Sequence, residues 1–148
     1  MVRSTSIGSR SGATTVELAA VISVFVLLLF GILEFCLVVY TYNVVQNASR
    51  EGARYAVVNS VDTTMVSDTQ NVVKTFMGGL DTKMKNYKCQ VYLADAAGNN
   101  IGLATDAQFG EYVLVDVQVD YVPLTPGLGF LTKTFTIRSK CGMGSEAN

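Results

Sequence analysis

The chain has 148 residues, a formal net charge of −1 and no histidine. Its length fits one domain, and the near-neutral charge gives no electrostatic footprint for nucleic acid. The lack of histidine removes the usual general base, the usual triad member and the commonest metal ligand. A hydrolase or metalloenzyme is therefore disfavoured, and we expect no metal and no cofactor.

A long apolar run dominates the N-terminal third of the chain. No charged residue lies between Leu18 and Leu33, and the run continues past Glu34 to Tyr40. A helix of that length crosses a hydrocarbon core of about 30 Å. The run is too long for the apolar part of a cleaved secretory signal, and no A-x-A site follows it. We therefore expect a single-pass anchor in a lipid bilayer.

Charges and aromatic residues around the run predict its orientation. Arg3 and Arg10 precede it without an acid, while Tyr40 and Tyr42 stand where an interfacial aromatic belt is expected. Because basic flanks stay in the cytoplasm, everything after Tyr42 is predicted to lie outside. The chain then divides into a cytoplasmic leader, a transmembrane part of the helix and an extracytoplasmic domain that includes the helix continuation: residues 1–12, 13–42 and 43–148.

The helix is predicted to continue beyond the membrane through residues 43–59, which contain no proline. Ala48, Gly52 and Ala56 recur every fourth residue and form a stripe of small residues along one face. Such a stripe lets another element pack close to the backbone. We expect that element to be the chain's own domain, and the alternative is a neighbouring subunit.

A second helix is predicted after the turn at residues 59–60, with Asp62 or Thr63 as its cap. Its apolar residues recur with a period near 3.6 and are expected in the core, and Gly78 and Gly79 should end or bend it. The apolar set is Met65, Val66, Val72, Val73, Phe76, Met77, Leu80 and Met84.

The period then changes to two, which predicts strands at residues 87–95, 111–122 and 131–139. Residues 97–110 are predicted to be a long loop, and the glycine-rich tail, residues 140–148, to be mobile. Each strand should have one wet face. The predicted class is α+β: a long N-terminal transmembrane helix and a small extracytoplasmic domain, with a second helix and a three- or four-stranded antiparallel sheet.

Three cysteines offer no metal or redox motif, because no C-x-x-C spacing occurs. Cys36 lies in the apolar run and is expected to behave as a small hydrophobic residue. Cys89 and Cys141 lie in the polar part. In an oxidising compartment these two could form a disulfide, and the alternative is two free thiols.

Glu17 is an acid at the head of the apolar run. An ionised acid costs about 2.5–3.5 kcal/mol at the centre of a membrane helix and less at its edge, so a positive partner is expected. Cutting the chain after Gly12 would create an amine on Ala13, four residues earlier on the same helix face. This amine could meet Glu17 of its own chain or of an adjacent molecule. The plainer alternative places Glu17 in the headgroup layer of a simple signal anchor.

These residues carry a family resemblance. Residues 12–17 (GATTVE) are similar to the processing site of type IV pilin-like proteins. With residues 31–35 (GILEF) and 48–56 (ASREGARYA), they resemble the TadE-like minor pseudopilins of tight-adherence (Tad) pilus systems. The resemblance is specific from residue 12 to about residue 58 and loose over the predicted sheet.

The resemblance implies a non-enzymatic protein of the bacterial inner membrane, or of the pilus itself, that serves assembly or initiation of an adhesive Tad or type IV-like pilus. A prepilin peptidase would cut between Gly12 and Ala13, and Glu17 would be the assembly or processing acid. The implied partners are pilin or pseudopilin subunits and pilus assembly proteins. Two alternatives remain: an uncleaved membrane-anchored binding or sensor protein, and a small periplasmic enzyme on an anchor, for which the sequence shows no motif.

Overall fold

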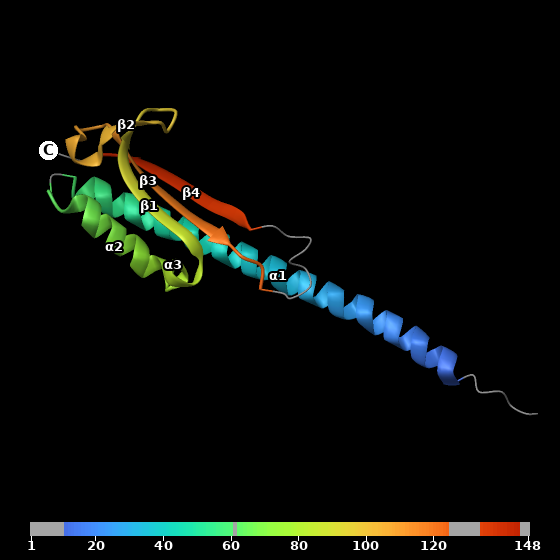
Figure 1. Ribbon diagram of the computed structural model, residues 1–148. Helices are drawn as coiled ribbons and strands as arrows, with labels where there is room; N and C mark the ends of the chain where they lie inside the picture. The colour runs from blue at the N-terminus through green and yellow to red at the C-terminus, as the bar shows by residue number, and fades with distance from the viewer. Residues whose placement is uncertain (1–10, 61, 125–133, 146–148) are drawn as a thin grey trace, which may run out of the picture. The chain divides into compact units, whose positions relative to one another are not determined.

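The computed structural model describes residues 11–60, 62–124 and 134–145. Its elements in chain order are α1 (Ser11–Val58), α2 (Met65–Met77), α3 (Leu80–Lys83), β1 (Lys85–Ala94), β2 (Asn100–Leu103), the 3₁₀ helix η1 (Ala104–Asp106), β3 (Tyr112–Tyr121) and β4 (Phe135–Gly144). The chain forms two compact units, Met1–Cys36 and Leu37–Asn148, and we call the second unit the head. The predicted α+β class, with a long N-terminal helix and an antiparallel sheet, is confirmed (Figure 1).

The helix α1 is continuous for 48 residues. Its length follows from the sequence, because no proline interrupts it. Polar side chains inside it bond to the helix itself: Ser23 Oγ donates to the Ala19 carbonyl at 2.8 Å, and Thr41 Oγ1 donates to the Leu37 carbonyl at 2.9 Å. The predicted continuation beyond the apolar run is therefore confirmed as far as Val58.

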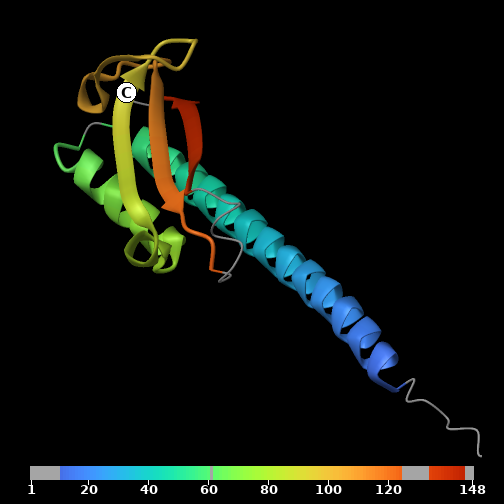
Figure 2. The ribbon, with the colours of Figure 1, turned by 45° about the vertical axis from the view of Figure 1, so that its right-hand side comes forward.

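Four antiparallel strands form one sheet in the order β2-β1-β3-β4. The central strand β3 pairs with β4 over its whole length, from Tyr112 opposite Gly144 to Tyr121 opposite Phe135. The second half of α1 and the helix α2 cover one face of the sheet, as the two views in Figure 1 and Figure 2 show. This covered face holds the main core.

The core forms where α1, α2 and β3 meet. Alternate residues of β3 point into it and are fully buried: Val113, Val115, Val117 and Val119. From α1, Ala48 and Ala56 are also fully buried, and a Cβ atom built on Gly52 would lie 3.3 Å from Val115 Cγ1. The small-residue stripe therefore packs against the chain's own domain, as expected.

The second helix departs from its prediction at both ends. It begins after Thr64, which makes no side-chain capping bond, so the prediction of Asp62 or Thr63 as the cap is wrong. Asp62 acts instead through its backbone carbonyl, which accepts a hydrogen bond from the Met65 N–H at 3.1 Å. The predicted end is confirmed, because Gly78 adopts a left-handed conformation with φ +58° that glycine tolerates.

Phe76 was expected in the core, but its side chain is 44% exposed. The helical period places it next to the buried Met77, and only one of these two adjacent positions can point at the sheet. The core prediction is confirmed for Met65, Val73 and Met77, which are buried.

Residues 97–110 are not one long loop, because they contain β2 and η1. The strand β2 pairs with the end of β1, with Leu103 opposite Tyr92, after a turn in which Gly98 has φ +80°. The prediction of a mobile tail from residue 140 is also wrong, since β4 extends to Gly144. Glycine has little tendency to form strands, but pairing with the long strand β3 extends β4 through Gly142 and Gly144. The strand β4 starts at Phe135, and residues 131–133, which were predicted to begin it, lie outside the described residues.

Candidate functional site

The predicted processing residues Gly12, Ala13 and Glu17 all lie on the first two turns of α1 and are exposed. Ala13 and Glu17 are four residues apart in a continuous helix, so their side chains share one face. The bond between Gly12 and Ala13 falls in the first helical turn, where the backbone N–H groups have no acceptor within the helix. Unwinding this turn breaks few hydrogen bonds.

Gly12 has no packing reason to be glycine. A Cβ atom built there meets nothing within 4 Å, whereas one built on Gly52 would lie 2.5 Å from Val73 Cγ2. Glycine inside a helix is about 1 kcal/mol less favourable than alanine. The fold therefore explains glycine at position 52 but not at position 12.

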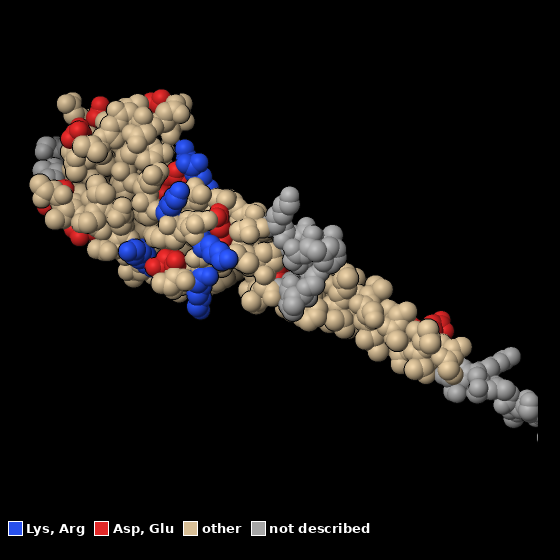
Figure 3. Space-filling view, viewed as in Figure 1, with Lys and Arg blue, Asp and Glu red and all other residues tan. Residues whose placement is uncertain are grey.

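The apolar part of α1 presents its side chains outward. Within the described part of the chain, it is the one helix long and apolar enough to cross a membrane. Val16, Leu18, Phe25 and Phe35 are each more than half exposed. In Figure 3 this stretch is almost entirely tan, while blue and red atoms gather on the head. Such a surface suits a bilayer or neighbouring apolar helices.

Two pairs of hydroxyl groups connect this part of the chain. One pair links α1 with β4, and the other links the turn after α1 with the residue after β4. Ser49 Oγ lies 2.8 Å from Ser139 Oγ, and Ser145 Oγ donates to Ser60 Oγ at 3.2 Å. All four residues are buried or partly buried. The face of α1 that carries Ser49 is therefore in contact with β4 inside the head.

The outer face of the sheet carries an ion pair that sequence reasoning missed. Arg138 donates through Nε to the two carboxylate oxygens of Asp116 at 2.8 and 3.0 Å, and also through Nη2. Asp116 is 4% exposed and the Arg138 side chain is 50% exposed. The hydrogen bonds to Asp116 raise the pKa of Arg138 further above its usual range. The alternation of polar and apolar residues within each strand predicts that both residues lie on the polar face. Which residue of β4 lies beside Asp116 depends on the register between β3 and β4.

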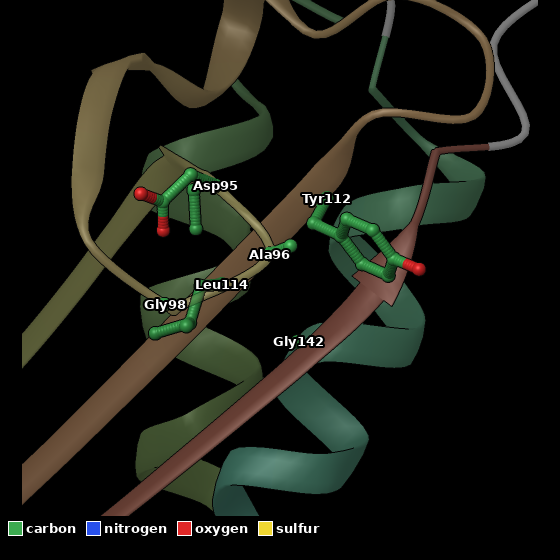
Figure 4. A pocket seen from close by; sticks show the side chains of 7 residues that line it. Asp95, Ala96, Gly98, Tyr112, Leu114 and Gly142 are labelled. Carbon is green, nitrogen blue, oxygen red and sulfur yellow. The ribbon is translucent and has the colours of Figure 1, made fainter.

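One solvent-exposed face was expected for each strand, but this outer face is not exposed along its whole length. Tyr92 and Leu114 on it are 7% and 6% exposed. The Leu114 side chain lies between two glycines. A Cβ atom built on Gly98 would lie 3.5 Å from Leu114 Cδ1, and one built on Gly142 would lie 3.8 Å from it. The turn that follows β1 folds over Leu114 (Figure 4).

A hollow of about 290 Å³ lies beside Leu114, with Tyr112 at its rim. Its acid, Asp95, is turned into its own loop, where Oδ1 accepts the backbone N–H groups of Ala97 and Asn99 at 2.9 and 2.8 Å. The hydrogen bonds from Asn99 lower the pKa of Asp95. The carboxylate therefore holds the turn together.

Cys89 and Cys141 are free thiols. They lie on β1 and β4, which are separated by β3. Two strand spacings are roughly 10 Å, beyond the Cα separation that a disulfide spans. Of the two alternatives, the structure therefore has the free thiols. Burial raises the pKa of Cys89 to about 11, so this thiol carries little thiolate at neutral pH.

Among the described residues, no three side chains of the types Cys, Asp and Glu are grouped so that they could hold a metal ion. Histidine does not occur in the chain at all.

The comparison with protein families bears on the first half of α1 and its continuation into the head. The model of the TadE-like protein family matches residues 12–54. This segment is TadE-like. The resemblance predicted from residues 12–17, 31–35 and 48–56 is thereby confirmed over the matched range. No curated protein and no solved structure matches the chain.

The TadE-like segment begins at Gly12 and ends at Arg54. It therefore contains the predicted cleavage site, Glu17, the apolar run and the first two residues of the small-residue stripe. The sheet and α2 lie outside it.

Proposed function

We propose that this protein is a minor pseudopilin-like subunit of a Tad or type IV-like adhesive pilus, cut by a prepilin peptidase after Gly12, that takes part in pilus assembly or initiation. The observation that carries the proposal is the TadE-like match over residues 12–54. The TadE-like family suggests a role associated with Tad pili. The membrane-anchoring apolar helix fits a place in the bacterial inner membrane.

The mechanism is physical and involves no catalytic residue in this chain. The apolar part of α1 would hold the subunit in the inner membrane, with Arg3 and Arg10 keeping the leader in the cytoplasm. Cleavage would remove this basic leader and leave an amine on Ala13. The amine would lie one helical turn from Glu17 of its own chain, or beside Glu17 of a neighbour packed with a small axial offset.

The packing of the head limits where subunits can meet through α1. The small-residue face of Ala48, Gly52 and Ala56 is already covered by α2 and β3. The exposed apolar surface lies instead in residues 12–36, where Val16 is 71% exposed and Phe35 is 69% exposed. We therefore place helix contacts between subunits in that segment, and contacts with other pilus proteins on the head.

The open state of Gly12 supports processing at this position. Neither a neighbouring side chain nor backbone strain requires glycine there. Recognition of a residue without a side chain by the peptidase would explain why position 12 is glycine, whereas the packing of the fold does not.

The deciding experiment is the mass of the N-terminal peptide of the protein recovered from native membranes. The proposal predicts a chain that begins at Ala13. A chain that begins at Met1 or Val2 would contradict processing and would favour the alternative, an uncleaved single-pass protein that presents a binding or sensor domain.

A further inference from the structure

Most lysines of the head lie in one short segment of the chain. Residues 74–88 hold Lys74, Lys83, Lys85 and Lys88 against a single acid, Asp81, and residues 89–132 contain no lysine or arginine. All four lysines are exposed. They lie on the last turn of α2, on α3 and on the first residues of β1.

The other end of the head carries acids without lysine or arginine. It comprises the turn after α1, the β1–β2 turn, η1 and the start of β3, and its acids are Asp62, Asp95, Asp106 and Glu111. On the face seen in Figure 3, this end shows red atoms without blue, and the blue atoms lie over the rest of the head, toward α3, the beginning of β1 and β4. The head is therefore electrically polarised.

The sheet register shows which part of α1 is level with the lysines. Lys85 pairs with Asp120, and Asp120 pairs with Thr136. Thr136 in turn lines a hollow together with Val39 and Tyr42 of α1. The start of β1, the end of β3 and the start of β4 therefore lie level with residues 38–42 of α1.

That level coincides with the expected surface of the membrane. Residues 18–39 extend about 33 Å as a helix, slightly more than a hydrocarbon core of about 30 Å. Tyr40 and Tyr42 then fall in the headgroup layer, and their side chains are 58% and 48% exposed. The lysines on the first residues of β1 lie at the same height.

The hollow beside this level has the chemistry of a lipid contact. It measures about 360 Å³, and Val38, Val39, Tyr42 and Phe135 line it together with the guanidinium-bearing Arg138. No acid lines it. Apolar and aromatic side chains suit the upper acyl chain and the interface, while the charge of Arg138 is already paired with Asp116.

The acids near this end are engaged within the head. Asp120 accepts hydrogen bonds from Thr136 at 2.6 Å and from Asn86 at 2.5 Å, and Asp116 is bound by Arg138. Asp81 is the remaining acid, against three neighbouring lysines. The positive charge of the lysines is therefore available to a ligand outside the head.

We propose that the lysine end of the head, defined by Lys83, Lys85 and Lys88 with Arg138 beside them, binds the headgroups of anionic phospholipids. This contact holds the lysine end of the head against the surface of the bilayer. The inference rests on the membrane anchor in the proposed function and not on processing or pilus assembly, so it can fail while those stand. The competing ligand for the lysines is the acidic end of a second copy.

The test uses the full chain, one copy per nanodisc, in phosphatidylcholine alone or with one third phosphatidylglycerol. The reaction of each lysine with an acetylating reagent is followed by mass spectrometry. We expect Lys83, Lys85 and Lys88 to react roughly threefold to fivefold more slowly in the anionic discs. High salt should remove the difference, because it screens the interaction.

Lys140 is the internal reference. It is exposed on β4 and pairs with Asp116, which lies four residues along β3 from the partner of Lys85 and two residues from the partner of Lys88, or about 13 and 7 Å. Its reaction should depend on the lipid less than that of Lys85, because the Debye length is about 8 Å. Equal rates for Lys83, Lys85 and Lys88 in the two kinds of disc would overturn the proposal. So would protection that appears in neutral discs only when several copies share one disc, because that result identifies a protein contact.

A charge variant gives a second readout. The triple variant Lys83→Gln, Lys85→Gln and Lys88→Gln changes only exposed side chains, and Lys140→Gln is its matched control. Phosphatidylglycerol that remains bound after detergent extraction is measured by mass spectrometry. The triple variant should lose this enrichment while Lys140→Gln keeps it. Equal enrichment in the wild type and the triple variant would contradict the proposed site.

Discussion

A Cβ atom placed on Gly52 would lie 2.5 Å from Cγ2 of Val73. Val73 cannot move aside easily, because it is fully buried and a β-branched side chain in a helix has one strongly preferred rotamer. At this point α1 and α2 approach so closely that only a hydrogen atom fits between them. The seam between the two helices, and through it the core against β3, therefore depends on one glycine.

Replacing Gly52 by valine should destabilise the head by about 3 kcal/mol, because the added side chain overpacks the seam. Urea unfolding in detergent, followed by hydrogen exchange of the β3 amides, measures the loss. The matched control is Gly31→Val, where a Cβ atom meets nothing within 4 Å. Equal unfolding midpoints for the two variants would disprove the close approach.

Replacing Arg138 by alanine should lower the free energy of unfolding by about 1–3 kcal/mol, since it strips the hydrogen bonds from the buried carboxylate of Asp116. Half of the Arg138 side chain is exposed, so solvent screens part of the effect. Lys140→Ala, on the same strand and also exposed, should have little effect. A Lys140 variant as unstable as the Arg138 variant would show that the ion pair has no special role.

Stability should fall as the pH rises from about 9 to about 11. Burial raises the pKa of Cys89 from 9.0 to about 11, so the folded chain holds this proton more tightly than the unfolded chain. The stabilisation is complete below pH 9 and is lost as the pH rises through the folded value, on the order of 2 kcal/mol. Burial also raises the pKa of Tyr87, which adds to the fall above pH 10.

The measurement is urea unfolding of the wild type and Cys89→Ala across this pH range. The variant should show a shallower fall between pH 9 and 10, where Tyr87 does not yet titrate. Identical slopes would exclude Cys89 as the cause.

Replacing Gly12 by valine should block processing without disturbing the fold, because the site is open. On a denaturing gel the variant should keep the size of the unprocessed chain. Gly31→Val serves again as the control, with the same change in a position outside the predicted cleavage site, and should be cut normally. A Gly12 variant that migrates at the size of the mature protein would show that cleavage does not depend on Gly12.

Replacing Glu17 by alanine should leave membrane insertion and the head unchanged and should weaken pilus assembly or processing. Glu17 lies on an exposed part of α1 outside the head, so its loss removes no contact within the core. Glu51→Ala, an acid on the same helix inside the head, is the control. Normal cleavage and normal pilus number in the Glu17 variant would deny the acid any role.

Much of the fold could be read from local patterns, because they need no partner to be recognised. The absence of proline predicts the length of α1, and the alternation of valines from Val113 to Val119 predicts β3 and its buried face. The TadE-like segment, with Gly12 and Glu17, is likewise a pattern of neighbours in the chain.

The tertiary structure decided what depends on residues far apart in the sequence. Pairing with β3 extended β4 through Gly142, although glycine has little tendency to form strands. Strand order separated Cys89 from Cys141, and register placed Arg138 against Asp116. No periodicity in a single segment contains this information, because hydrogen bonds between strands and close packing arise only when the segments meet.

The same division holds for the sites. The sequence alone determined a membrane-length apolar helix, an acid at its head and a glycine before the predicted cut, since each is a local property of composition and spacing. Only the tertiary structure showed that Gly12 is free of packing while Gly52 is enclosed by Val73. It alone brought Lys85 level with Tyr42 of α1, because that relation passes through the register of three strands.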